Sequence, residues 1–117
     1  MSIEVKVQIP KPVVLEGDYF EVTINYRIAG TASANSSLEY RIDCMTTGTK
    51  IKEWTPATSA TSTGVYIFAV DSTPNRIIDR SNANEKRLIT VVADRGTGYS
   101  PRDNIQYIVN NRGWRDT

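Results

Sequence analysis

The chain of 117 residues contains no histidine and only one cysteine, Cys44. The absence of histidine removes the usual general base, the Ser-His-Asp and Cys-His catalytic arrangements, and the commonest zinc ligand. A single cysteine excludes an intramolecular disulfide. The thirteen carboxylates are scattered through the sequence without forming a cluster. We therefore expect a protein that is not an enzyme and has no cofactor or metal.

An excess of one charge and a long apolar run are also missing. The sequence has 14 basic and 13 acidic residues, without the clustered lysine and arginine on which nucleic-acid binding depends. Its longest apolar run, residues 65–70, is far shorter than the ~20 residues of a membrane span. The start, MSIEVK, lacks the basic and apolar segments of a signal peptide. We expect synthesis in the cytoplasm and neither nucleic acid nor membrane among the partners.

Alternation of apolar and polar residues is the dominant pattern that is present. It is cleanest over residues 20–28, where every second side chain is apolar, as in a strand with one buried face. Turn residues separate this segment from further predicted strands at residues 3–9, 38–44, 50–54, 65–71, 88–93 and 105–110, and from a short edge strand at 76–79. The pattern predicts an all-β fold, an antiparallel β-sandwich of seven or eight strands. A single domain would cover residues 1–110, with a C-terminal tail at residues 111–117.

The phase of the alternation predicts which side chains face the core. Cys44 is in phase with Leu38 and Tyr40, so we expect it to be a buried small residue rather than a nucleophile. Residues 65–70 are apolar on both faces; the outer face is either covered by residues 72–84 or offered to a partner. The residues predicted to point inward are Val22, Ile24, Tyr26, Tyr40, Ile42, Ile89 and Val91.

Three local motifs each allow a functional and a simpler structural interpretation. The glycines at 96 and 98 suggest a phosphate cradle, but no helix and no Lys-Ser or Lys-Thr pair follows them, so we predict a hairpin turn. Asp71 and Asp79 lack the dense spacing of a calcium loop and are interpreted as surface carboxylates. Residues 35–37, Asn-Ser-Ser, match the acceptor pattern for N-glycosylation, but we interpret them as a polar loop.

Aromatic and arginine side chains are the candidates for contact with another protein. Trp54 either packs across a sheet edge or under a loop, or forms a platform for a ligand. The tail tryptophan either folds back on the domain or anchors a partner, because Trp and Arg carry much interface energy. We expect the tail to be mobile in the free protein and ordered when bound. The candidate contact residues are Arg95, Tyr99 and Arg102 in the hairpin, and Arg112, Trp114 and Arg115 in the tail.

Two stretches carry a resemblance to known folds. SLEYRIDCMTTGTKIKEW resembles the third strand, hairpin and next strand of an immunoglobulin-like or fibronectin type III-like sandwich, and KRLITVVADRGTGYSP resembles its sixth strand and following turn. Lys86 and Arg87 stand where that fold has a tyrosine.

More narrowly, YRIDCMTTGTKIKEWTP, NEKRLITVVADRG and the compact size resemble small immunoglobulin-like proteins of tailed bacteriophages. This resemblance implies a virion structural protein, either a capsid decoration protein or a module at a head or tail interface. Its partners would be phage capsid or tail proteins, or further copies of itself on the particle. The alternative is a carbohydrate- or receptor-binding module with an aromatic platform at Trp54 or Tyr99.

Overall fold

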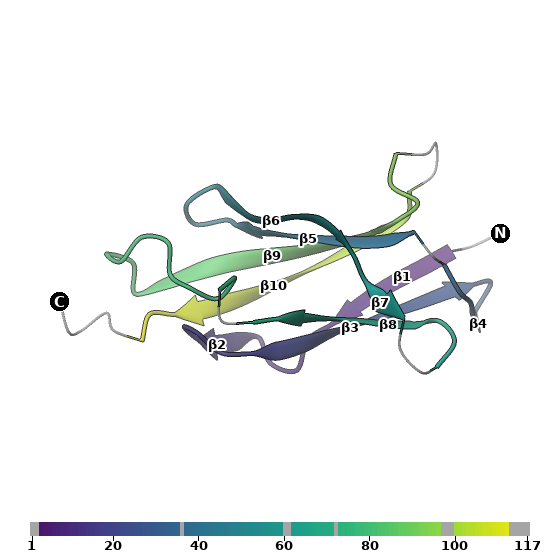
Figure 1. Ribbon diagram of the computed structural model, residues 1–117, viewed down its shortest axis with the longest axis horizontal. Coiled ribbons are helices and arrows are strands. Elements are labelled where there is room, and N and C mark those ends of the chain that lie inside the picture. The colour runs from purple at the N-terminus through teal and green to yellow at the C-terminus, as the bar shows by residue number, and fades with distance from the viewer. Residues whose placement is uncertain (1–2, 36, 60–61, 72, 97–99, 113–117) are drawn as a thin grey trace.

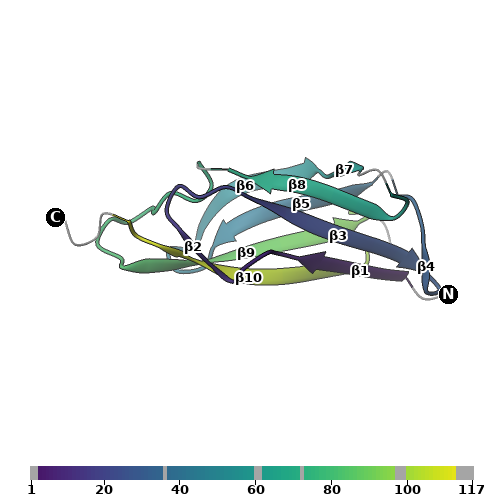
Figure 2. The same ribbon diagram turned by 90° about the horizontal axis from the view of Figure 1, so that it is seen from below.

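The computed structural model describes residues 3–35, 37–59, 62–71, 73–96 and 100–112. These residues form ten strands and no helix, and the strands make two five-stranded sheets that pack face to face (Figures 1 and 2). The predicted all-β sandwich is confirmed. The strands are β1 (Ile3–Gln8), β2 (Val13–Leu15), β3 (Phe20–Ile28), β4 (Thr31–Ala32), β5 (Leu38–Cys44), β6 (Thr49–Pro56), β7 (Thr58–Ser59), β8 (Val65–Val70), β9 (Asn84–Ala93) and β10 (Arg102–Asn110).

The first sheet has the order β1-β3-β8-β7, with β4 also paired to β3, and the second has the order β2-β10-β9-β5-β6. The pairs are antiparallel except for β2 and β10, which run parallel. The prediction of a purely antiparallel sandwich of seven or eight strands was therefore wrong in this detail. The short strands β2, β4 and β7 carry too few residues to show a periodic pattern in the sequence.

The parallel pair follows from the two prolines after β1. Proline has no N–H to donate to a strand ladder, so β1 ends and the chain crosses from the first sheet to the second. There the carbonyl of Pro12 accepts a hydrogen bond from Ile108 N–H at 2.8 Å, and Glu16 N–H donates to the carbonyl of Asn110 at 2.8 Å. The first fifteen residues thus supply an edge strand to each sheet.

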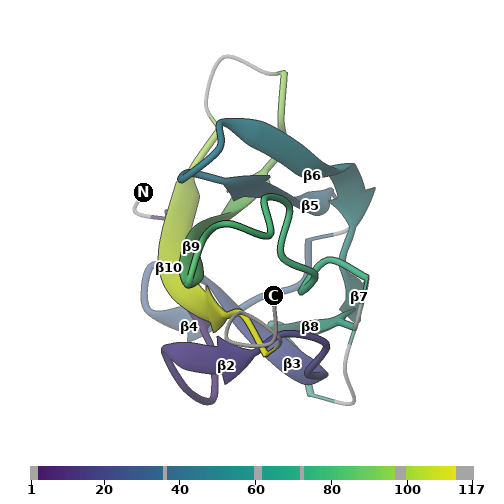
Figure 3. The ribbon, with the colours of Figure 1, turned by 90° about the vertical axis from the view of Figure 1, so that its left-hand side faces the viewer.

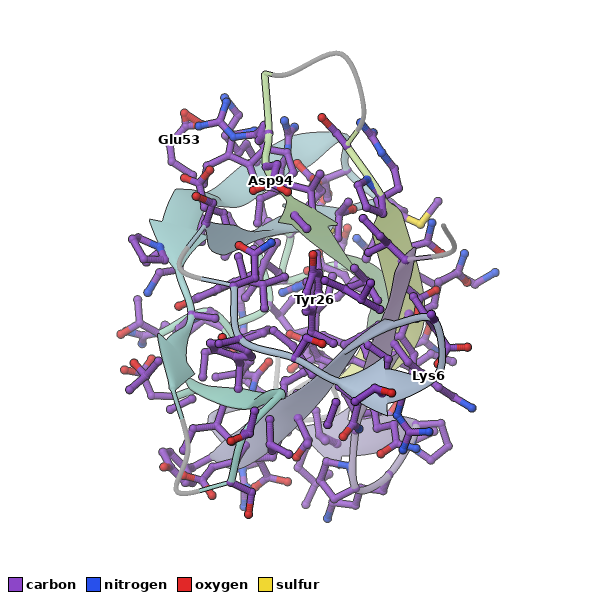
Figure 4. All side chains as sticks on the ribbon, turned by 90° about the vertical axis from the view of Figure 1, so that its right-hand side faces the viewer. Lys6, Tyr26, Glu53 and Asp94 are labelled. Atoms are coloured by element: carbon purple, nitrogen blue, oxygen red, sulfur yellow. The ribbon has the colours of Figure 1, made fainter. Side chains whose placement is uncertain are left out.

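The core lies between the sheets and has the predicted composition. All seven residues expected to point inward are at most 4% exposed, which confirms the phase of the alternation. Two aromatic contacts join the sheets: Tyr40 stacks on Phe68 with ring centroids 3.6 Å apart, and Phe20 meets Tyr107 edge to face at 5.1 Å. Figure 4 shows Tyr26 between the sheets, whereas Lys6 and Glu53 point outward.

The connection between β9 and β10 is a hairpin, as predicted, with Arg102 paired to Val92. Its described part turns through positive φ at Asp94 (55°) and Gly96 (90°), a conformation that glycine adopts without steric cost. Ala93 N–H closes the turn on the carbonyl of Pro101 at 2.9 Å. Residues 97–99, including Gly98 and Tyr99, lie outside the described residues.

The predicted edge strand at residues 76–79 was wrong, because this segment belongs to an irregular loop. The loop, residues 73–83, lies across the opening between the two sheets at one end of the sandwich (Figure 3). It does not lie over the outer face of β8, where Val65 and Ile67 are half-buried and Ala69 is exposed. Ile77 of this loop is only 6% exposed and joins the core.

Candidate functional site

The three described candidate contact residues lie at the two ends of the sandwich. Arg95 and Arg102 flank the β9–β10 hairpin, and Arg112 follows β10 at the opposite end, near the C-terminus (Figure 1). Strand β10 separates Arg102 from Arg112 by about 30 Å at the usual rise per residue. The structure therefore does not bring these arginines together. Tyr99, Trp114 and Arg115 lie outside the described residues.

Arg95 takes part in a network on the outer face of the second sheet. Its guanidinium lies 4.9 Å from the ring centroid of Trp54, and its Nε donates to Glu39 at 3.2 Å. Arg41 also lies over Trp54, at 5.8 Å. Two cation–π contacts therefore hold Trp54, which is half-buried on the edge strand β6. This position agrees with the interpretation of Trp54 as a residue packed across a sheet edge.

Arg102 and Arg112 differ in their surroundings. Arg102 is exposed and has no partner among the described residues. Arg112 donates to the carbonyl of Glu16 at 3.2 Å and to Asp18 Oδ1 at 3.4 Å. Arg112, the second residue of the tail, is thus attached to the turn between β2 and β3.

Beneath the 73–83 loop, the structure contains a buried charged cluster of Cys44, Glu85 and Arg87. All three residues are 0% exposed. Arg87 Nη1 lies 2.8 Å from Glu85 Oε1 and 3.1 Å from Cys44 Sγ. The prediction that Cys44 is buried is confirmed, but the thiol contacts a guanidinium and a carboxylate as well as apolar neighbours.

Sequence reasoning missed this cluster, although a signal for it was present. Glu85 and Arg87 are in phase with Ile89 and Val91 on β9, so the alternation of the strand places them on the inward face. The usual rule that charged residues are exposed conceals this signal. Such residues are seldom fully buried unless they are paired, and here each supplies the partner of the other.

Glu85 also organises the loop above it. Its carboxylate accepts the backbone N–H groups of Ile78 and Asp79, both at 2.9 Å, and the side-chain amide of Asn82 at 3.1 Å. Burial by itself raises the pKa of Glu85, but these hydrogen bonds and the one from Arg87 outweigh it and lower the pKa to about 2. A charged carboxylate is stable in this position because each oxygen accepts several donors.

A second carboxylate holds the same loop from the other side. Glu16 accepts the N–H of Ile77 at 2.9 Å and forms an ion pair with Arg80. Burial raises the pKa of Glu16, but these donors outweigh it, so the pKa lies below its ordinary value. The N–H groups of residues 77–79 therefore bind carboxylates instead of a neighbouring strand, which explains why no edge strand forms.

The third buried polar contact joins Asn75 and Tyr107. The Tyr107 hydroxyl donates to Asn75 Oδ1 at 2.8 Å, and Asn75 Nδ2 donates to the carbonyl of Asp18 at 2.7 Å. Burial raises the pKa of Tyr107 above its usual range, so this hydroxyl remains a donor. The loop is thus attached to β10 and to the turn before β3.

A cavity of about 620 Å³ opens at this end, between the 73–83 loop and the turn after β2. Its lining is mainly polar and includes two arginines. Arg80 pairs with Glu16, whereas the guanidinium of Arg76 has no partner among the described residues. The lining residues are Glu16, Gly17, Thr73, Arg76, Ile77 and Arg80.

A smaller groove of about 210 Å³ lies at the β2–β10 edge of the second sheet. It is mainly apolar, and its lining residues are Pro12, Val13, Lys86, Gln106, Tyr107 and Ile108. Val13 and Leu15 on the adjoining edge strand are 42% and 45% exposed. This edge exposes apolar side chains, and at Leu15 its backbone is satisfied by Asp18, which accepts the Leu15 N–H and donates its own N–H to the Leu15 carbonyl, both at 3.0 Å.

The motifs with a possible metal role take part in local hydrogen bonds. Asp71 accepts the N–H of Thr73 at 3.2 Å, and Asp79 accepts the N–H of Ser81 at 3.0 Å. No three His, Cys, Asp or Glu residues of the described part of the chain converge on a common point. Asn35, the asparagine of the N-glycosylation pattern, donates from Nδ2 to Asp94 Oδ2 at 3.3 Å.

Among the described residues there is no helix with the length and apolar character needed to cross a membrane.

Comparisons with known proteins concern the fold. No family model matches the chain, and no curated protein matches it. A DUF4785 family protein from Legionella pneumophila is similar in structure, with a TM-score of 0.50 and 14% identity over 93% of this chain. A cohesin module from a Clostridium perfringens family 33 glycoside hydrolase has a TM-score of 0.41 and 13% identity, covering 94% of this chain and 98% of that module.

This chain spans 28% of the length of the Legionella structure. At 14% identity the likeness shows a shared β-sandwich fold and nothing about activity or partners. The class that the structure defines is therefore a β-sandwich module, and a more specific role is a matter for proposal.

Proposed function

We propose that this chain is a non-enzymatic structural module of a virion, either a capsid decoration protein or a head- or tail-associated protein, that acts through protein–protein contacts. The phage part of the proposal rests on the resemblance of residues 40–56 and 84–96 to small immunoglobulin-like phage proteins. Capsid or tail proteins are the proposed partners, and neighbouring copies on the particle can contribute contacts.

The observation that carries the contact role is the way in which charged side chains hold the 73–83 loop at one end and the start of the hairpin, at Arg95, at the other. Glu16 and Glu85 fix the 73–83 loop through backbone N–H groups. At the other end Arg95 joins the hairpin to Glu39 and Trp54. Loops held in one conformation lose little entropy when they bind, which favours recognition by surface complementarity. The exposed Arg102 and the tail residues Arg112, Trp114 and Arg115 are the proposed contacts.

The alternative role, a carbohydrate- or receptor-binding module, requires a free aromatic platform. Trp54 does not provide one in this structure, because Arg41 and Arg95 both lie over its ring. The other proposed platform residue, Tyr99, lies outside the described residues. No specific observation therefore favours this role over the structural one.

Particle association tests the proposal. We expect the chain to sediment with purified particles from the same source at a fixed number of copies per particle. Truncation after Arg112 and, separately, Trp114→Ala should reduce this association without changing the free energy of unfolding. Lys6→Ala, on the first sheet, serves as a control that should bind normally. Absence of the chain from particles, together with failure to bind them when added, would overturn the proposal.

A further inference from the structure

The cavity beside the 73–83 loop has a lining that is fixed before any ligand arrives. The backbone of Arg76 is held from two sides: its N–H donates to the carbonyl of Thr73 at 3.2 Å, and its own carbonyl accepts from the buried Arg87 at 2.5 Å. On the opposite wall, Gly17 N–H donates to the carbonyl of Asn75 at 3.1 Å. The two walls of the cavity are therefore joined by hydrogen bonds.

Charge on the lining is not balanced. The lining carries two guanidinium groups and one carboxylate. Glu16 neutralises Arg80, which leaves Arg76 as a positive charge without an ion-pair partner in the described part of the chain. The Thr73 hydroxyl likewise has no partner among the described residues. Asp71 and Asp79, near Arg76 in the chain, accept the N–H groups of Thr73 and Ser81. Asp18, which follows Gly17, pairs with Arg112.

This combination suits an anion with a planar, two-oxygen acceptor. A guanidinium binds a carboxylate through two parallel hydrogen bonds, a geometry that a lysine cannot reproduce. The volume of about 620 Å³ lies within the range of ligand-binding pockets and exceeds what one small ion fills. Thr73, a second lining residue, offers its hydroxyl as a further donor.

We infer that this cavity is a docking site for an acidic segment of a protein partner, with Arg76 as the residue that pairs with a Glu or Asp side chain. The inference rests on the proposed function, since it names the chemistry of the surface that the module would contact. It adds a site that is distinct from the hairpin and that adjoins the tail, because Arg112 donates to the carbonyl of the lining residue Glu16. Arg80 keeps its contact with Glu16 and shapes the wall.

Titration with a defined peptide, followed by amide chemical shifts, tests the site. The probe is a pentapeptide blocked at both ends and carrying two glutamates; its counterpart carries two glutamines. We expect saturable shifts of the amides of Gly17, Thr73 and Arg76 with the glutamate peptide alone. Arg76→Glu should weaken binding at least tenfold, and Arg76→Lys should weaken it less. Arg27→Glu has the same charge change at an exposed position near the other end of β3 and should bind the glutamate peptide normally.

Several outcomes would overturn the inference. Equal shifts with the glutamine peptide would exclude charge recognition, and equal shifts with inorganic phosphate would show a general anion site. Unchanged affinity in Arg76→Glu would place the contact elsewhere. Because Arg76 is exposed, its variants should fold normally, and a thermal unfolding curve verifies this. If Arg76→Glu unfolds and its amide shifts are lost for that reason, the affinity of Arg76→Lys for the glutamate peptide decides the inference.

A particle-binding arm separates this inference from the proposed function. If Arg76→Glu loses the peptide but stays on particles, the docking role of the cavity is wrong and the virion role stands. If the wild-type chain does not bind particles, the virion role fails, and the peptide titration still decides whether the cavity binds acidic segments.

Discussion

The guanidinium of Arg87 lies 3.1 Å from the sulfur of Cys44, and both side chains are completely buried. The two residues face each other across the β5–β9 pair, and Glu85 lies beside them on the same face of β9. A charged group thus occupies an inward position of β9, the strand on which Ile89 and Val91 fill the next inward positions. The first two predictions concern this cluster.

Replacement of Arg87 by methionine should be strongly destabilising. It leaves Glu85 buried without its ion-pair partner, a change that typically costs about 3–5 kcal/mol. Arg41→Met breaks the part-exposed pair with Asp43 and is the matched control, with a cost of about 1 kcal/mol or less. Urea unfolding of both variants measures the difference. Equal losses of unfolding free energy in the two variants would show that the buried Glu85–Arg87 pair is no more important for stability than the part-exposed pair.

Stability should fall in acid because of Glu85. The pKa of this carboxyl is about 2 in the folded protein, against an ordinary value of 4.5. Its contribution is therefore complete above pH 4.5 and is lost as the pH falls through 2, with a total of at most about 3 kcal/mol. Glu16, whose pKa is also lowered, acts in the same direction.

The free energy of unfolding of the wild type and of Glu85→Gln at pH 7 and pH 2 measures this effect. The difference between the two pH values should be smaller in the variant. If the variant does not fold, the carboxyl carbon shift of Glu85 in the wild type gives its pKa directly. A value near 4.5 would contradict the prediction.

Cys44 should resist modification in the native state. Because the thiol is 0% exposed, a thiol reagent should label it only after denaturant is added. Particle association should be unchanged in Cys44→Ala, because the residue does not reach the surface. Labelling within minutes in native buffer would show that the β5–β9 face opens readily.

Ile24 should be among the most costly core residues to truncate. It is 0% exposed at the centre of β3, so Ile24→Ala should cost about 2–5 kcal/mol. Val13→Ala, at a position 42% exposed, is the control and should cost well under half as much. Denaturant midpoints with an unchanged slope measure both values. Similar costs for the two variants would argue against the position of the core.

Much of the sandwich could be predicted from the sequence because the evidence was local. The alternation over residues 20–28 placed Val22, Ile24 and Tyr26 on the inward face, and the structure confirms this. The segment after Ala93 was predicted to be a hairpin from its glycines, and β9 does pair with β10. In both cases the information lies within a few consecutive residues.

The candidate site depended on residues far apart in the chain. Glu16 binds the N–H of Ile77, and Asn75 joins Asp18 to Tyr107; no local pattern indicates such partners. A carboxylate that caps loop N–H groups looks the same in sequence as one in solvent. For this reason the 76–79 segment was predicted to be a strand.

The sequence by itself determined which faces of the strands are apolar, and thereby that two sheets must pack together to remove those faces from water. Only the tertiary structure decided that the chain crosses between the sheets after β1, that Glu85 and Arg87 are buried together, and that Arg76 lies beside a cavity without an ion partner among the residues that the structure describes. The physical reason is that burial of apolar surface depends on the phase of each strand, whereas a buried charge is stable only where distant donors converge on it.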